Sequence, residues 1–194
     1  MMNREIALRN VTSLLQTLER VGVTAWIQDG TLLGLTRDGS LIPWDHDTDT
    51  GCFITDWTPA AHAALQAEGF TLRGTLGHPE NGWQHRWARD GEKTDIFFHY
   101  LDGRRQWHAA YHAGRQYRYA YDRFPLERFD AGGVSVWVPS PPEAFLLTKY
   151  GEDWRKPKRA WHFATSPANA RRQARATPGR EVAMLIDRIR EDLT

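Results

Sequence analysis

Three aspartates alternate along the segment Asp45-His46-Asp47-Thr48-Asp49. In an extended chain successive side chains point to opposite faces, so this spacing predicts that the three carboxylates line one edge of a strand. Like charges this close repel and raise one another's pKa unless a cation neutralises them. Oxygen-rich sites suit Mg²⁺ or Mn²⁺, and Mg²⁺ is commonly held by one or two carboxylates plus substrate phosphates. The triplet therefore predicts a metal-assisted transferase of the phosphoryl type.

The elements expected around the triplet are those of an α+β (mixed α/β) domain. We expect a helix over 6–21, a strand over 23–27, a short helix ending near Asp38, the aspartate strand and a helix over 58–68. The candidate strands that follow are 70–76, 82–88, 94–101, 106–112 and 134–138. Ser140 is a candidate cap for a helix over 144–150, and a last helix is expected at about 181–193. This order predicts a mixed β-sheet flanked by helices.

Length and composition fit one globular domain over residues 1–194. The chain has 41% hydrophobic residues and a net charge of +1. Cys52 is the only cysteine, which excludes an internal disulfide and a cysteine-based zinc site. No segment approaches the roughly 18 apolar residues of a membrane span, and the first residues lack the apolar run of a signal peptide. We therefore expect a cytoplasmic protein with no membrane span.

A long motif around the aspartates resembles the LicD family, which includes bacterial phosphocholine transferases and the human fukutin and fukutin-related proteins. Its residues are Gly30-Thr31-Leu32-Leu33-Gly34, Arg37, Gly39 and Ile42-Pro43-Trp44-Asp45-x-Asp47-x-Asp49. A second block, Lys149-Tyr150-Gly151-Glu152-Asp153-Trp154-x-x-Pro157, is similar to the closing motif of that family. The resemblance covers about residues 26–158. It implies a nucleotidyltransferase-like domain.

That fold implies a glycine turn, a strand with two carboxylates and a third carboxylate on a neighbouring strand. Gly30 lets backbone N–H groups approach a phosphate closely, and the Thr31 hydroxyl can add a donor. By resemblance, Asp47 and Asp49 bind the metal. Asp95 is the best third ligand, because an acid leading into an apolar strand is costly to bury alone. Its alternatives are the catalytic base and a structural ion-pair partner.

Five further residues are candidates for catalysis or substrate binding. Asp45 is either a catalytic or supporting carboxylate or a turn cap, and Asp29 either contacts substrate or only shapes a turn. The position of Arg37, between the glycines and the aspartates, favours contact with phosphate. Tyr150 and Trp154 either pack in the core or stack on a base or sugar.

Three other polar residues near these motifs are expected to be structural. His46 and Thr48 should face away from the carboxylates if the aspartate strand is regular. His99 shares a strand face with Asp95, and we interpret it as a core or rim histidine.

A basic segment at about 155–180 follows the second motif. Its cations are Arg155, Lys156, Lys158, Arg159, Arg171, Arg172, Arg175 and Arg180. Interleaved prolines argue against one long helix. The segment is either solvated or contacts phosphates of a donor or an anionic acceptor. Nucleic acid is the weaker alternative, because no known binding motif accompanies the charge.

The function implied by the resemblance is that of a LicD-type phosphotransferase. It would move phosphocholine or an alditol phosphate, such as ribitol phosphate, from a CDP-linked donor to a hydroxyl of a glycan or small acceptor, releasing CMP. One alternative keeps the fold but transfers a nucleotidyl group from a nucleoside triphosphate and releases pyrophosphate. Another is a non-catalytic nucleotide-binding module, which would keep its affinity without the aspartates. The products distinguish these hypotheses.

Overall fold

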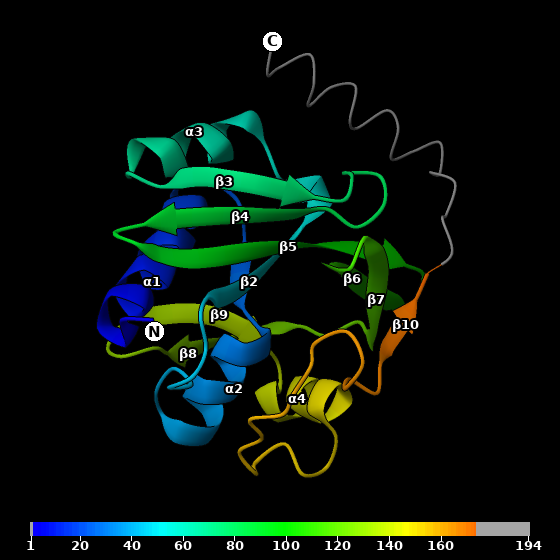
Figure 1. Cartoon of the computed structure of the whole chain (residues 1–194). Helices are drawn as coiled ribbons and strands as arrows, with labels where there is room; N and C mark the ends of the chain where they lie inside the picture. The colour runs from blue at the N-terminus through cyan, green and yellow to red at the C-terminus, as the bar shows by residue number, and fades with distance from the viewer. Residues whose placement is uncertain (1, 174–194) are drawn as a thin grey trace.

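The computed structural model describes residues 2–173 and places helices on both faces of a mixed β-sheet (Figure 1). The described helices are α1 (Arg4–Arg20), α2 (Asp29–Asp38), α3 (Pro59–Ala67) and α4 (Pro142–Tyr150), with a 3₁₀ turn over Ile54–Asp56. The expected α+β class is therefore confirmed. The helix expected at 181–193 and the end of the basic segment lie outside the described residues.

Within residues 2–173, ten strands form the sheet. They are β1 (Ala25–Ile27), β2 (Thr48–Phe53), β3 (Thr71–Leu76), β4 (Gln84–Arg89), β5 (Glu92–Asp102), β6 (Arg105–His112), β7 (Arg115–Asp122), β8 (Leu126–Asp130), β9 (Ser135–Pro139) and β10 (Ala170–Arg172). Their order is β10-β7-β6-β5-β2-β1-β9-β8, and the hairpin of β3 and β4 joins through β4 to β5. The pairs β2–β5 and β1–β9 are parallel, and the other pairs are antiparallel.

One face of the sheet is covered by α1 and α3, which also pack against each other. Asn3 caps α1, because its Oδ1 accepts from the Ile6 N–H at 3.3 Å. Leu14 and Leu18 of α1 are fully buried against the strands. The predicted cap of α3 is confirmed: the Thr58 hydroxyl accepts from the Ala61 N–H at 3.3 Å. This layer holds much of the core. Among residues 2–173 no helix is both long and apolar enough to cross a bilayer.

The helices α2 and α4 pack together on the other side, where α2 contacts β2 and α4 contacts β7 and β9. Gly39 ends α2 in the left-handed conformation, with φ of 66°. The predicted cap of α4 is wrong. Pro141 is the residue before the helix, and the Ser140 hydroxyl is instead hydrogen-bonded to the Glu127 carboxylate. The two helices bring the two sequence motifs side by side.

The expected aspartate strand begins later than predicted, at Thr48, so that only Asp49 of the triplet lies in β2. The cause is a turn after Pro43, in which the Asp45 N–H donates to the Ile42 carbonyl at 3.1 Å. Asp45 and Asp47 therefore precede the strand and do not share one regular edge with Asp49. In the parallel register of β2 and β5, Asp49 pairs with Asp95, as the third-carboxylate hypothesis requires.

Candidate active site

The four candidate carboxylates Asp45, Asp47, Asp49 and Asp95 line one cavity of about 350 Å³, which we call the central cavity. It lies between the start of α2, the end of α4 and the strands β2, β4 and β5. Its other lining residues are Asp29, Gly30, His46, Gln84, Arg86, Phe97, His108, Ala110, Tyr111, Tyr119, Lys149, Tyr150, Trp161 and Phe163. Residues from both motifs therefore meet around the aspartates.

Gly30 and Thr31 fix Asp49 through its side chain and its backbone. The Gly30 N–H donates to Asp49 Oδ2 at 2.9 Å, and the Asp49 N–H donates to the Thr31 hydroxyl at 2.7 Å. A Cβ at Gly30 would lie 2.8 Å from Asp45 Oδ2 and 3.1 Å from Asp49 Oδ2. Glycine is therefore needed for this close approach. The Thr31 side chain is buried between α2 and β2 and does not line the cavity, so its predicted contact with substrate is replaced by this contact with Asp49.

Asp95 is held by two residues of β4. Gln84 Nε2 donates to Asp95 Oδ2 at 2.6 Å, and Arg86 Nε lies 3.9 Å from the same oxygen. Arg86 and Asp95 are cross-strand partners in the antiparallel register, which explains their proximity. Neither Gln84 nor Arg86 was a candidate in the sequence, because only the pairing of β4 with β5 brings them to the carboxylate.

Burial raises the pKa of every carboxylate in the cluster, and repulsion adds to the effect at Asp45, Asp49 and Asp95. Burial, then the charge of Asp47, raises the pKa of Asp45 to about 6 and that of Asp95 to about 7. Burial also raises the pKa of Asp47, with Lys93 opposing it, and raises that of Asp49 well above its usual range. The cavity is therefore short of positive charge when all four groups are ionised.

This donor set fits a divalent cation that completes its coordination with other oxygens. Asp45 Oδ2 and Asp49 Oδ2 converge on the same point beside Gly30, and Asp95 is next to Asp49 in register. Among residues 2–173, no three carboxylate, imidazole or thiol side chains are close enough to form a complete metal site. One or two carboxylates with phosphate oxygens and water are the usual Mg²⁺ environment. The residues present match that environment.

A buried ion pair links the two motifs. Lys149 Nζ of α4 contacts Asp29 Oδ1 of α2, and the two side chains are only 5% and 6% exposed. Asp29 is the first residue of α2 and has a φ of 51°, which is uncommon for a non-glycine residue. Lys149 also lies over the Tyr119 ring, 4.6 Å from its centroid. Asp29 therefore does more than shape a turn: it forms a buried ion pair, and its closest partner is Lys149 of the protein itself.

His108 lies 3.8 Å from Asp29 through its Nε2, but it does not neutralise that carboxylate. Burial and then the charge of Lys149 hold the pKa of His108 well below its usual range, so the ring is neutral. Lys149 and His108 were not candidates in the sequence. For Lys149 a signal existed: it opens the second motif, and a lysine is rarely buried unless it is paired.

A second cavity of about 260 Å³ adjoins the first, and we call it the aromatic cavity. It is lined by Gly30, Leu33, Arg37, Ile42, Trp44, Asp45, Tyr150, Trp154, Lys156, Lys158, Arg159 and Trp161. Gly30, Asp45, Tyr150 and Trp161 line both cavities. Arg37 and Trp154 therefore line the aromatic cavity, together with Asp45, but not the central cavity.

The aromatic cavity places part of the basic segment at the site, because residues 156–161 form one of its walls. The Arg37 side chain is 6% exposed and forms two hydrogen bonds with Asp38, at 2.9 and 2.7 Å. Trp154 is 4% exposed, and Tyr150 lies against Trp161 with ring centroids 4.7 Å apart. Trp161 and Arg159 were missed as individual site residues, because the basic charge alone did not indicate which residues fold back.

The three residues expected to be structural are placed as follows. Thr48 is buried and its hydroxyl is 2.9 Å from that of Thr94, whereas His46 is exposed at the rim of the central cavity. His99 is a core histidine, with Nε2 2.8 Å from Gln28 Oε1 and Nδ1 3.2 Å from Gln106 Nε2. The structural interpretation of Thr48 and His99 is confirmed. That of His46 is not, because His46 lines the cavity.

Comparison with known proteins agrees with the motifs. A family described as LicD/FKTN/FKRP, nucleotidyltransferase domain, matches residues 22–141. Ribitol-5-phosphate transferase FKTN of Mus musculus is 31% identical over 157 residues, which cover 79% of this chain and 34% of that protein. The Homo sapiens protein of the same name is 30% identical over 157 residues, which again cover 79% of this chain and 34% of that protein.

Two shorter or weaker similarities extend this result. Ribitol 5-phosphate transferase FKRP of Homo sapiens is 49% identical over 39 residues, which cover 20% of this chain and 8% of that protein. An uncharacterised protein of Rickettsia typhi is 27% identical over 143 residues, 73% of this chain and 44% of its own length. The chain thus spans about a third of the length of its FKTN relatives. The extent of the family match shows that this chain belongs to the LicD/FKTN/FKRP nucleotidyltransferase-domain family.

Proposed function

We propose that the protein transfers an alditol phosphate, such as ribitol phosphate, from a CDP-linked donor to a hydroxyl of a glycan or small acceptor. The observation that carries this proposal is the junction of two unlike cavities. Five carboxylates line the central cavity, and the adjoining aromatic cavity presents aromatic rings with Arg37, Lys156, Lys158 and Arg159. Aromatic rings suit a base, and guanidinium and ammonium groups suit phosphates. The ribitol-5-phosphate transferase activity for which the FKTN relatives are named supports the same class of reaction.

The cations of the aromatic cavity favour an uncharged head group over choline. A quaternary ammonium is recognised by open aromatic faces. Here Arg159 lies over Trp44 at 5.1 Å, and Arg155 lies over Trp154 at 4.1 Å, both measured to the ring centroid. One of the protein's own guanidinium groups thus covers a face of each of these two rings, and its charge would repel a cationic head group. We therefore prefer an alditol phosphate to phosphocholine.

We propose Mg²⁺ or Mn²⁺ as the cofactor, held by one or two of the carboxylates Asp47, Asp49 and Asp95 together with phosphate oxygens and water; when bound it would neutralise charge on the phosphates. The chain's own residues have the remaining tasks. The Gly30 N–H holds the Asp49 carboxylate in place. Asp45 has a pKa of about 6 from burial and from Asp47, which suits a group that accepts a proton near neutral pH. Asp95 is the alternative base.

The reaction is a single displacement in this proposal. The acceptor oxygen forms a bond to the phosphorus that carries the alditol, and the bond from that phosphorus to the CMP oxygen breaks. The acceptor proton passes to a carboxylate of the central cavity, and CMP leaves with the bonding electron pair. Charge stabilisation by the cations of the aromatic cavity would favour this leaving group.

Phosphorus NMR of the products tests the proposal. The purified protein is incubated with CDP-ribitol, CDP-glycerol or CDP-choline and Mg²⁺, with ribitol and ribitol 5-phosphate as acceptors. We expect CMP release with a CDP-alditol, loss of release in EDTA, recovery with added Mg²⁺ or Mn²⁺, and loss in Asp49→Asn. Asp122→Asn is the matched control, because the Asp122 side chain is 93% exposed on β7.

Two additional measurements, incubation with CTP or ATP and nucleotide titration of the aspartate variants, separate the alternatives. Pyrophosphate release from CTP or ATP, with no CMP from any CDP-alditol, would replace phospho-alcohol transfer by nucleotidyl transfer. Nucleotide binding that survives Asp47→Ala and Asp49→Ala, with no turnover of any donor, would indicate a non-catalytic binding module.

A further inference from the structure

A third hollow meets the carboxylates from the side of the β3–β4 hairpin. It has a volume of about 570 Å³, and we call it the basic groove. It is lined by Asp47, Gly69, Thr71, Arg73, Arg86, Trp87, Ala88, Arg89, Asp90, Gly91, Lys93 and Asp95. Asp47, Asp95 and Arg86 line both the groove and the central cavity. The groove shares no lining residue with the aromatic cavity, so it is a separate approach to the carboxylates.

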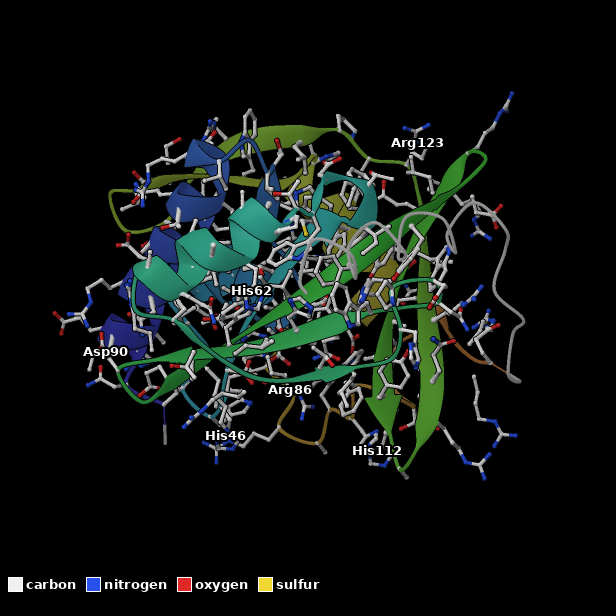
Figure 2. The ribbon with its side chains drawn as sticks, turned by 90° about the horizontal axis from the view of Figure 1, so that it is seen from above. His46, His62, Arg86, Asp90, His112 and Arg123 are labelled. Carbon is white, nitrogen blue, oxygen red and sulfur yellow. The ribbon has the colours of Figure 1, made fainter. Side chains whose placement is uncertain are left out.

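Strand register puts the cations of the groove on one face of the sheet. Asp95 pairs with Arg86, and Lys93 with Ala88, so that Arg86, Lys93 and Asp95 point the same way. The opposite face belongs to the helices: Trp87 is fully buried and lies 5.0 Å from His62 of α3, measured between ring centroids. Figure 2 shows Arg86 on the side of the strands away from His62 and toward His46.

Arg73 adds a third cation to this face. It lies two residues after Thr71, and both residues line the groove, as regular alternation along β3 requires. The register of β3 with β4 shifts between Leu72 and Gly74, so that Arg73 is also the extra residue of a β-bulge. Bulges are frequent beside active sites.

Two of the three cations form no ion pair in the part of the chain that the structure describes. Within residues 2–173, no ion pair or hydrogen bond involves the side chain of Arg73 or Lys93, although the charge of Lys93 acts on Asp47, and Arg86 is paired only loosely with Asp95, at 3.9 Å. Arg89, in contrast, is engaged by Asn10 and Ser13, at 3.0 Å each. The groove thus has cationic groups available on one wall and carboxylates of the reaction centre at its inner end.

We infer that the basic groove binds the acceptor, and that this acceptor is a polyol or sugar carrying a phosphate. Its phosphate would lie against Arg73 and Lys93, while its hydroxyl would reach Asp47 and Asp95 at the inner end. Cations at a fixed separation from the carboxylates would select acceptors with an anionic group at that distance. An uncharged polyol would gain no charge attraction from these residues. This inference rests on the proposed function for the identity of the hydroxyl substrate.

The groove is tested first by binding, without any donor. Glycerol 3-phosphate and glycerol are titrated into ¹⁵N-labelled protein, and the amide signals of Thr71, Ala88 and Gly91 are followed. We expect these amide signals to shift with glycerol 3-phosphate and not with glycerol. In Arg73→Gln/Lys93→Gln its Kd should rise at least about tenfold, the equivalent of roughly 1.4 kcal/mol. Arg104→Gln, an exposed cation in the β5–β6 turn, is the control and should keep the wild-type Kd within twofold.

Two results would overturn the inference: no shifts around the groove with glycerol 3-phosphate, or equal weakening in Arg104→Gln and the groove variant. The charge-conserving variant Arg73→Lys/Lys93→Arg should retain binding, which separates loss of charge from loss of local structure. Failure of the proposed function gives a different result, because CMP release from every CDP-alditol would be absent in the wild type while phosphate binding in the groove persisted. Transfer to ribitol 5-phosphate in preference to ribitol then completes the test.

Discussion

The buried pair of Lys149 with Asp29 allows a quantitative prediction for Lys149→Met. Methionine has nearly the length of lysine and fills the same space, so the change removes the charge with little loss of packing. The Asp29 carboxylate would then be about as buried as before, at 6% exposure, with no cation in contact. Burial, the larger cause of the low pKa of His108, persists in the variant, so that ring stays neutral and cannot replace the ammonium.

Removal of one partner from a buried pair costs about 3–5 kcal/mol, because the other charge stays buried and uncompensated. For a domain of this size, each kcal/mol lowers the melting temperature by about 2–4 °C. We therefore expect Lys149→Met to melt roughly 6–20 °C below the wild type. Asp29→Asn in the same chain should recover most of that loss, because asparagine tolerates the φ of 51° and carries no charge.

Urea unfolding of the wild type, both single variants and the double variant gives the coupling energy of the pair. Lys158→Met is the matched control, because its ion pair with Asp153 spans 2.6 Å but is 40% and 47% exposed. An exposed pair of this kind contributes about 0–1 kcal/mol. The reasoning is refuted if Lys149→Met loses no more stability than Lys158→Met, or if the losses of the two single variants simply add in the double variant.

Three further predictions concern the carboxylate cluster. Asp49→Asn should lower CMP release roughly 100-fold or more. The metal-free variant should be at least as stable as the wild type, because the substitution removes a carboxylate that its neighbours repel, and a lower melting temperature would contradict this. Gly30→Ala should cost about 1–3 kcal/mol of stability by crowding Asp45 and Asp49, and it should reduce turnover. Turnover at the wild-type rate would show that the close approach of the Gly30 backbone to these carboxylates is dispensable. Because folding raises the pKa of Asp45 and Asp95 to about 6 and about 7, the native state binds more protons, and metal-free stability should fall as pH rises from about 4 to 7. Thermal melts across that pH range test the fall of stability with pH, which should become smaller when Mg²⁺ is added.

Local signals predicted the parts of this fold that local physics controls. The cap Thr58, the stop at Gly39 and the long motif around the aspartates each depend on a few neighbouring residues. Strand β7 escaped detection, because its sequence mixes arginine with tyrosine and only some of its side chains are buried. Strands of this kind depend on their partners more than on their own pattern.

The parts of the site that could not be predicted depend on contacts between distant segments. Asp95 was a candidate because an acid before an apolar run is conspicuous, but Gln84 and Arg86 reach it only through the register of β4 with β5. In the same way, Lys149 is an ordinary helix residue until α4 packs beside α2. The triplet was placed on one regular strand edge for a related reason: the sequence does not reveal the hydrogen bond of Asp45 with Ile42 that delays the strand.

That delayed strand gives each aspartate of the triplet a different environment. On a regular strand, alternate residues would stand about 7 Å apart along one straight edge of the sheet. Instead Asp45 faces both the aromatic cavity and the central cavity, Asp49 faces the central cavity alone, and Asp47 faces the central cavity and the basic groove. A donor entering through one opening and an acceptor entering through the other would therefore each meet a carboxylate before reaching Asp49. The turn after Pro43 is what permits this arrangement, so a substitution that extended β2 back to Asp45 should impair the reaction even if all three carboxylates were kept.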